Sequence, residues 1–127
     1  MKVLAQEFGD ARDMLVALGN ENRQAIFMAL LENPGGVRVG DLAELASLSR
    51  PATSHHLKIL KDAGLVERFT VGTKSYYHAS ARLDRWTQLA RLTAHAETFV
   101  RRIAALEAEG VSPCPSAHRI DRKEKNA

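Results

Sequence analysis

The chain has 127 residues, 45% hydrophobic and 26% charged, and a formal net charge of +3, which fits one compact globular domain. Its single cysteine excludes an internal disulfide framework, and its short apolar runs exclude a membrane-spanning helix, which needs about 18 consecutive apolar residues. Acidic residues interrupt the N-terminal segment before a signal-peptide core can form. We therefore expect a cytoplasmic protein without a membrane partner.

Positive charge is concentrated in the middle of the chain. Residues 50–82 carry six Lys or Arg against two Asp or Glu, a net charge of +4. Residues 1–49 have a net charge of −3, and residues 83–127 have +2. A basic segment between less basic ones favours a polyanionic partner such as nucleic acid.

Apolar residues at helical spacing predict a first helix over residues 3–18, which Gly19 ends. Asn20 is a suitable N-cap for a second helix, because its side-chain oxygen can accept a backbone N–H of the first turn. The Asn-Pro-Gly-Gly sequence at residues 33–36 stops that helix.

Two further helices are predicted over residues 39–46 and 50–63, joined by a tight turn. Ser49 is a good N-cap for the second of them, Pro51 is tolerated in a first turn, and Gly64 suits the left-handed position that follows a helix. A short helix, a tight turn and a longer helix make a helix-turn-helix.

A β-hairpin is predicted directly after this pair of helices. Residues 65–71 and 74–80 are rich in Val, Phe, Thr and Tyr, and Gly72-Thr73 suits a two-residue turn between them. In this register Phe69 faces Tyr76 across the strands. The expected fold is therefore mainly α with a small hairpin, a winged helix-turn-helix.

The last predicted helix covers residues 82–108 and carries two apolar rows. At about 1.5 Å per residue it would be about 40 Å long, more than a body of this size can cover, so part of it should pack against a second copy. We expect residues 1–110 to form the DNA-binding and dimerisation domain, and residues 111–127, poor in apolar residues, to be a flexible tail.

Three motifs in this order are specific: Leu-Gly-Asn-Glu-Asn-Arg at residues 18–23, Ser-Arg-Pro-Ala-Thr-Ser-His-His-Leu-Lys at 49–58 and Leu-Lys-Asp-Ala-Gly-Leu-Val at 60–66. With them, residues 18–79 resemble the winged helix-turn-helix of the ArsR/SmtB family of bacterial repressors. The resemblance implies dimerisation through the N- and C-terminal helices. The residues expected at that dimer interface are Leu4, Phe8, Leu15, Trp86, Leu89, Leu92, Phe99 and Ile103.

DNA contacts are expected from the outer side of the helix over residues 50–63 and from the hairpin. The first turns of a recognition helix enter the major groove, where Arg50 can bind guanine, and Ser54 or His55 can bind a base edge or a phosphate. The resemblance implies a structural role for His56. The full expected set is Arg50, Thr53, Ser54, His55, Lys58, Lys61, Arg68, Thr73 and Lys74.

The ligand positions of the family's metal sensors are mostly changed. Where thiolate sensors have Cys-x-Cys, this chain has Arg38 and Gly40. Where zinc sensors have Asp and His at the start of the last helix, it has Asp84 and Trp86, and the partner position holds Glu97. Two oxygen ligands are too few for a tetrahedral zinc site, so we expect no metal and no cofactor.

The sequence thus predicts a homodimeric repressor that binds an inverted repeat in a promoter and responds to a non-metal or unknown signal. One alternative is a sensor with a non-standard metal site that adds His95 to Asp84 and Glu97, or a redox response at Cys114. Others are an organic effector near Trp86 and a winged helix that binds only protein. An enzyme is not expected, because the chain shows no nucleophile with its base and no complete catalytic constellation.

Overall fold

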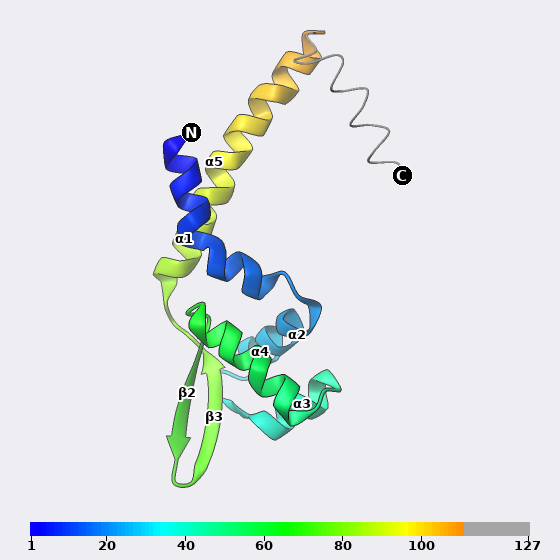
Figure 1. The fold of residues 1–127 in the computed structure, drawn as a ribbon, viewed down its shortest axis with the longest axis vertical. Helices are drawn as coiled ribbons and strands as arrows, with labels where there is room; N and C mark the ends of the chain where they lie inside the picture. The colour runs from blue at the N-terminus through cyan, green and yellow to red at the C-terminus, as the bar shows by residue number, and fades with distance from the viewer. Residues whose placement is uncertain (111–127) are drawn as a thin grey trace. The chain divides into compact units, whose positions relative to one another are not determined.

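A computed structural model describes residues 1–110 and is mainly α-helical with a small antiparallel sheet (Figure 1). In chain order, the elements are α1 (Lys2–Leu18), α2 (Glu21–Glu32), β1 (Val37–Arg38), α3 (Val39–Ala46), α4 (Arg50–Asp62), β2 (Val66–Val71), β3 (Lys74–Ala79) and α5 (Leu83–Ala108). Met1–Leu92 form one compact unit, and the remainder of α5 belongs to a second unit. The expected tail at residues 111–127 and Cys114 lie outside the described residues.

The predicted helix ends are confirmed by their capping contacts. The Asn20 side chain accepts a hydrogen bond from the backbone N–H of Arg23 at 3.1 Å, at the start of α2. At the start of α4, the Ser49 hydroxyl oxygen accepts from the backbone N–H of Ala52 at 3.2 Å. Gly64 follows α4 with a φ of +78°, which a residue without a Cβ adopts readily.

The hairpin has the predicted register. Phe69 of β2 is opposite Tyr76 of β3, and their rings stack with centroids 5.4 Å apart. The sheet has a third strand that the sequence does not predict, because a strand of two residues is too short to show a periodicity. This strand, β1, pairs with β3 so that Arg38 is opposite Tyr76, in the sheet order β1-β3-β2.

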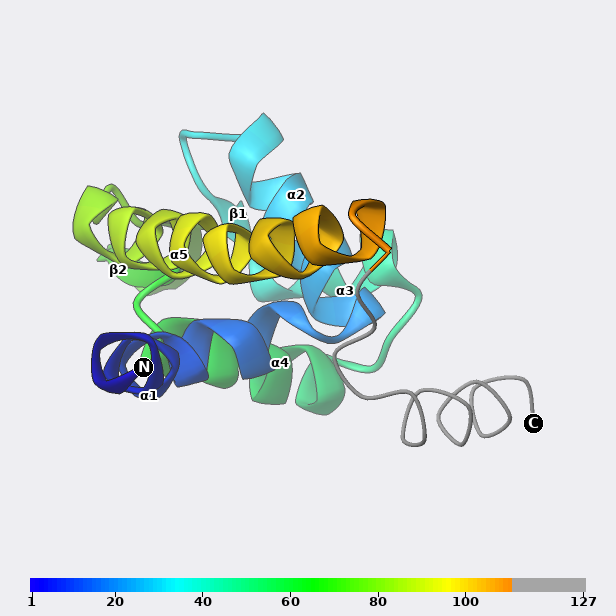
Figure 2. The same cartoon turned by 90° about the horizontal axis from the view of Figure 1, so that it is seen from above.

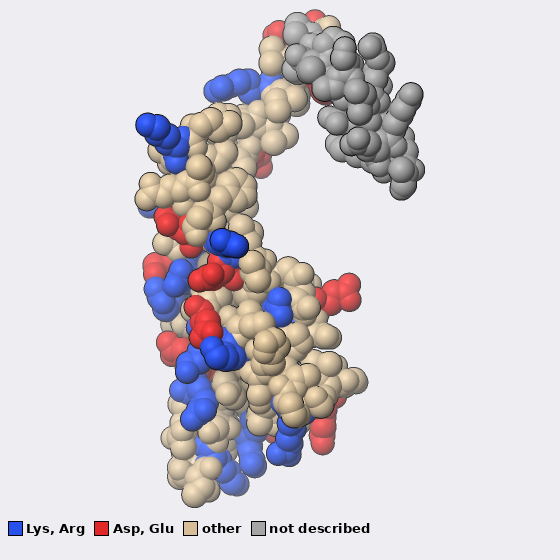
Figure 3. Space-filling model, viewed as in Figure 1, with Lys and Arg blue, Asp and Glu red and all other residues tan. Residues whose placement is uncertain are grey.

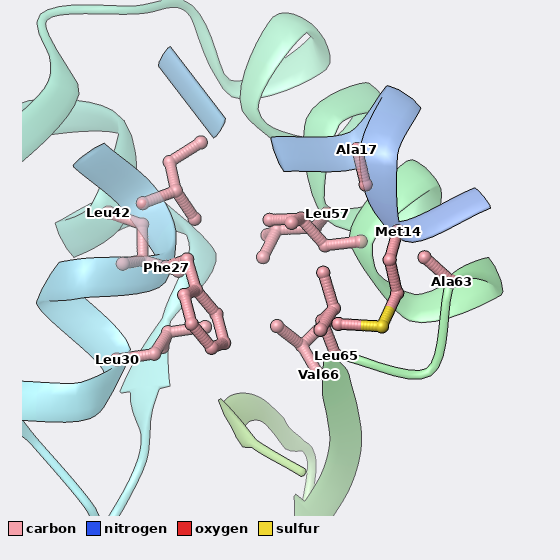
Figure 4. Close-up of a cluster of buried hydrophobic side chains, with 11 residues drawn as sticks. Met14, Ala17, Phe27, Leu30, Leu42, Leu57, Ala63, Leu65 and Val66 are labelled. Carbon is pink, nitrogen blue, oxygen red and sulfur yellow. The ribbon is translucent and has the colours of Figure 1, made fainter. Parts of the chain in front are cut away.

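The core of the Met1–Leu92 unit joins α1, α2, α3 and α4 to the start of β2. Met14 of α1 lies near Leu65 and Val66 on one side, and Phe27 of α2 faces them from the other (Figure 4). Two leucines of α4, Leu57 and Leu60, have no exposed surface. Figure 2 shows α1 running alongside α4. Packing on several sides holds α4 in place and leaves one of its faces outward.

Candidate nucleic-acid interface

The outward face of α4 carries polar and basic side chains. Because Leu57 and Leu60 point into the core, residues about half a turn away point out. The exposed residues on this face are Ser54, His55, Lys58 and Lys61. The structure therefore places four of the predicted DNA-contacting residues together on one helix face.

Thr53 does not belong to this face, and its prediction as a DNA-contacting residue is wrong. Its side chain has no exposed surface, and its hydroxyl donates to the backbone carbonyl of Ser49 at 2.8 Å. Thr53 and Ser54 are consecutive, and the step of about 100° between neighbouring residues of a helix puts one side chain inside and the other outside.

A basic groove runs between α4 and the hairpin. It has a volume of about 290 Å³. Lys58 makes an exposed ion pair with Asp62 at 2.8 Å, so its charge is partly balanced in the free protein. Four predicted residues line this groove, together with two that the sequence does not predict, Asp62 and Tyr77. The lining residues are Ser54, Lys58, Lys61, Asp62, Arg68 and Tyr77.

A second depression, the hairpin-tip hollow, lies where the hairpin turn meets the starts of α3 and α4. Its volume is about 210 Å³. The Arg50 guanidinium lies over Gly40, so close that a Cβ at residue 40 would be 2.7 Å from Arg50 Nη2. Three predicted residues, Arg50, Thr73 and Lys74, are brought together here. The complete lining is Arg38, Val39, Gly40, Asp41, Arg50, Thr73, Lys74 and Ser75.

Arg38 is the basic residue that sequence reasoning missed as part of this surface. Its only sequence signal is its place between a Gly-Gly turn and a helix, and it comes beside Lys74 only because β1 joins the hairpin. Figure 3 shows Lys and Arg side chains gathered over the hairpin in the lower part of the view.

His56 faces away from the exposed side of α4 and is half-buried. Its Nδ1 atom lies 3.2 Å from Nη1 of Arg23. Burial lowers the pKa of His56, and the positive charges of Arg23 and His55 lower this pKa further. The imidazole is therefore held in its neutral form, as a packing residue.

The predicted dimer-interface residues differ in exposure. Phe8, Leu15 and Ile103 are exposed, whereas Leu4 and Phe99 are half-buried. The prediction fails for Leu92, which is 2% exposed and so cannot present its side chain to a second copy.

Two more predicted interface residues have partners within the Met1–Leu92 unit. Leu89 is half-buried against the core cluster. The ring of Trp86 stacks on Phe27 with centroids 5.8 Å apart. This packing contact explains why an aromatic residue stands at position 86, and no bound ligand is needed to explain it.

The candidate metal ligands on α5 are engaged in ion pairs. Arg82 donates to Asp84 through Nε at 3.3 Å and through Nη2 at 2.8 Å, and this contact lowers the pKa of the Asp84 carboxyl. Glu97 accepts from Nε of Arg101 at 2.8 Å. Within residues 1–110, no three His, Cys, Asp or Glu side chains gather as a ligand set.

Residues 20–68 match the family model described as the bacterial regulatory protein, arsR family. The HTH-type transcriptional regulator Rv2034 of Mycobacterium tuberculosis is 41% identical over 90 residues, which cover 64% of this chain and 80% of that protein. The chain belongs to the ArsR family. The arsenical resistance operon repressor of Bacillus subtilis is another relative of this ArsR-family chain, 41% identical over 61 residues, which cover 48% of the chain and 57% of the repressor.

Solved structures agree with this assignment. An ArsR-like transcriptional regulator from Rhodococcus sp. RHA1 is 28% identical, with a TM-score of 0.63 over 83% of this chain and 96% of that one. This ArsR-family protein is a DNA-binding transcriptional regulator and not an enzyme. Across residues 1–110, no helix is both long and apolar enough to cross a membrane.

Proposed function

We propose that the protein is a homodimeric repressor that binds an inverted repeat in a promoter, with α4 in the major groove and the hairpin against the neighbouring backbone. The observation that carries this proposal is the outward face of α4, where Ser54, His55, Lys58 and Lys61 lie side by side and continue into the basic groove. A repressor bound there would block access of the polymerase to the promoter.

The side chains of this surface divide by chemistry. Arg50, Ser54 and His55 lie in the first two turns of α4, the part that reaches base edges in a helix-turn-helix. Lys61 and Arg68 line the basic groove and suit phosphates, which contribute affinity without sequence choice.

The proposed dimer uses apolar side chains that one copy leaves in water. Phe8 of α1 is 49% exposed, and on the second half of α5 Ile103 has the same exposed fraction. Burial of such side chains against a second copy is favourable. With two-fold symmetry, the recognition helices would reach major grooves about 34–36 Å apart, which requires a nearly palindromic operator.

The inducing signal is proposed to be something other than a metal ion bound at α5. A zinc ion there would have to displace Arg82 from Asp84 and Arg101 from Glu97, and these two carboxylates are too few for a tetrahedral site.

Fluorescence anisotropy tests the proposal with a duplex from upstream of the gene and a random duplex, at two salt concentrations, with and without zinc. Tight binding that prefers the upstream duplex and ignores zinc is expected. Equal affinity for both duplexes would contradict sequence-specific repression, and release by zinc would contradict a non-metal signal.

Two variants test the division of roles. Arg50→Ala should weaken binding to the upstream duplex more than to the random one. Lys61→Ala should weaken both alike and lower the salt dependence. If each variant loses the same affinity for the upstream duplex as for the random one, this division of roles is refuted.

A further inference from the structure

We propose that the hairpin-tip hollow binds one phosphate of the DNA backbone, held by Arg38 and Lys74. This inference rests on the proposed DNA-binding function and adds Arg38 to the interface. Nothing in the spacing of the sequence places residue 38 beside residue 74.

The hollow gathers three cationic side chains from three separate segments. Arg38 comes from β1, Arg50 from the first turn of α4 and Lys74 from the first position of β3. The only acidic residue in the lining is Asp41. The excess of positive charge favours an anion over a cation.

These three cationic side chains are available to bind an anion. Within the described part of the chain, none of the three makes an ion pair, in contrast to Lys58, which is paired with Asp62. An unpaired cation can bind a phosphate without first losing an internal partner. The planar fork of the Arg38 guanidinium can donate two parallel hydrogen bonds to phosphate oxygens.

The backbone around the hollow gives Arg38 a defined position. The backbone of Arg38 is opposite Tyr76 on β3, the central strand of the sheet. The strand that carries Arg38 is therefore joined to the hairpin that carries Lys74. Thr73 and Ser75 add hydroxyl groups to the same lining, and hydroxyls can donate to phosphate oxygens. The size of the hollow, about 210 Å³, leaves room for a phosphate group.

The test measures binding to the upstream and random duplexes across a series of salt concentrations. The variants are Arg38→Ala, Lys74→Ala, their combination and Arg38→Lys, with Arg12→Ala as the control that removes the same charge from an exposed position of α1. Urea unfolding of each variant verifies that it is folded.

Arg38→Ala should weaken binding to both duplexes by the same factor. The combined variant should reduce the slope of log affinity against log salt by about 0.9 per protomer, because the two side chains share one phosphate. Arg38→Lys should keep the slope, and Arg12→Ala should bind as the wild type does.

Two results would overturn the inference while the wild type still binds DNA. One is an Arg38→Ala variant with unchanged affinity. The other is a combined variant whose slope falls by about 1.8 per protomer, which would assign two separate phosphates. A wild-type protein that binds neither duplex would instead refute the proposed function.

A last comparison separates a DNA phosphate from free phosphate. Without DNA, potassium phosphate should raise the unfolding temperature of the wild type and of Arg38→Ala equally. A larger rise in the wild type, together with an unchanged DNA affinity of Arg38→Ala, would assign the hollow to a free anion and overturn the assignment to DNA.

Discussion

Arg23 donates from Nη1 to Nδ1 of His56 at 3.2 Å and so connects the start of α2 to the inner side of α4. The same guanidinium donates through Nε to the carbonyl of Ala17 at 2.8 Å and through Nη2 to that of Val16 at 3.0 Å. Because an arginine has no acceptor, Nδ1 of His56 must be the unprotonated ring nitrogen. One side chain thereby ties the end of α1 to the helix that carries the candidate DNA contacts.

Arg23→Ala should lower the free energy of unfolding by about 1–3 kcal/mol, because the last carbonyls of α1 and the ring nitrogen of His56 lose a donor. Urea denaturation measures this loss. Arg23→Lys should restore only part of it, since an ammonium group cannot reproduce the planar three-nitrogen contact. An unchanged midpoint in Arg23→Ala would show that solvent replaces these contacts at no cost.

Stability should fall as the pH is lowered through the titration range of His56. The pKa of His56 is lowered in the folded protein, so below about 6.5 the unfolded chain takes up this proton before the folded one does. The stabilisation from His56 is therefore complete above that pH and decreases below it. His56→Gln removes this titration, so the difference in unfolding free energy between the wild type and this variant should shrink from about pH 7.5 to about pH 5. A constant difference would contradict the lowered pKa.

Substitutions at Thr53 and Ser54 should have opposite effects, one on stability and the other on DNA binding. Thr53→Val should cost about 1 kcal/mol of stability, because it removes a buried hydroxyl that donates to the carbonyl of Ser49, and should leave DNA affinity unchanged. Ser54→Ala should do the opposite, with weaker binding to the upstream duplex and a stability change within about 0.5 kcal/mol. Anisotropy and urea unfolding on both variants check the pair. Weakened DNA binding by folded Thr53→Val would contradict the assignment of Thr53 to the core.

Gly64→Ala should destabilise the protein by about 1–2 kcal/mol. The φ of +78° is unfavourable for alanine, and the added Cβ would be 2.9 Å from Nε of Arg85. Gly9→Ala is the matched control, because Gly9 lies within α1 and a Cβ there meets nothing within 4 Å. This control should gain up to about 1 kcal/mol from helix propensity. Thermal unfolding of the two variants should therefore shift in opposite directions.

Local interactions made much of the fold predictable. The caps at Asn20 and Ser49 and the turn at Gly72 depend on contacts between residues at most three positions apart, so the side chains show them directly. The pairing of Phe69 with Tyr76 follows from the length of that turn. Helical spacing likewise predicted that Lys58 and Lys61 point away from the core.

Thr53 and Leu92 are two predicted site residues that the structure buries. Thr53 stands four positions before Leu57, so helical spacing alone puts it on the inward row of α4. What covers Leu92 depends on which neighbours pack against α5, and spacing along one helix does not contain that information.

The amino-acid sequence by itself determined the order of the helices, the hairpin and the basic outer side of α4, because short-range spacing and capping decide these features. Only the tertiary structure decided that Arg38 lies beside Lys74 and that Arg23 reaches His56, 33 positions further along the chain. Such contacts depend on how β1 joins β3 and how α2 packs on α4. They form when burial of the shared core brings distant segments together, and this is the physical reason that no local pattern predicts them.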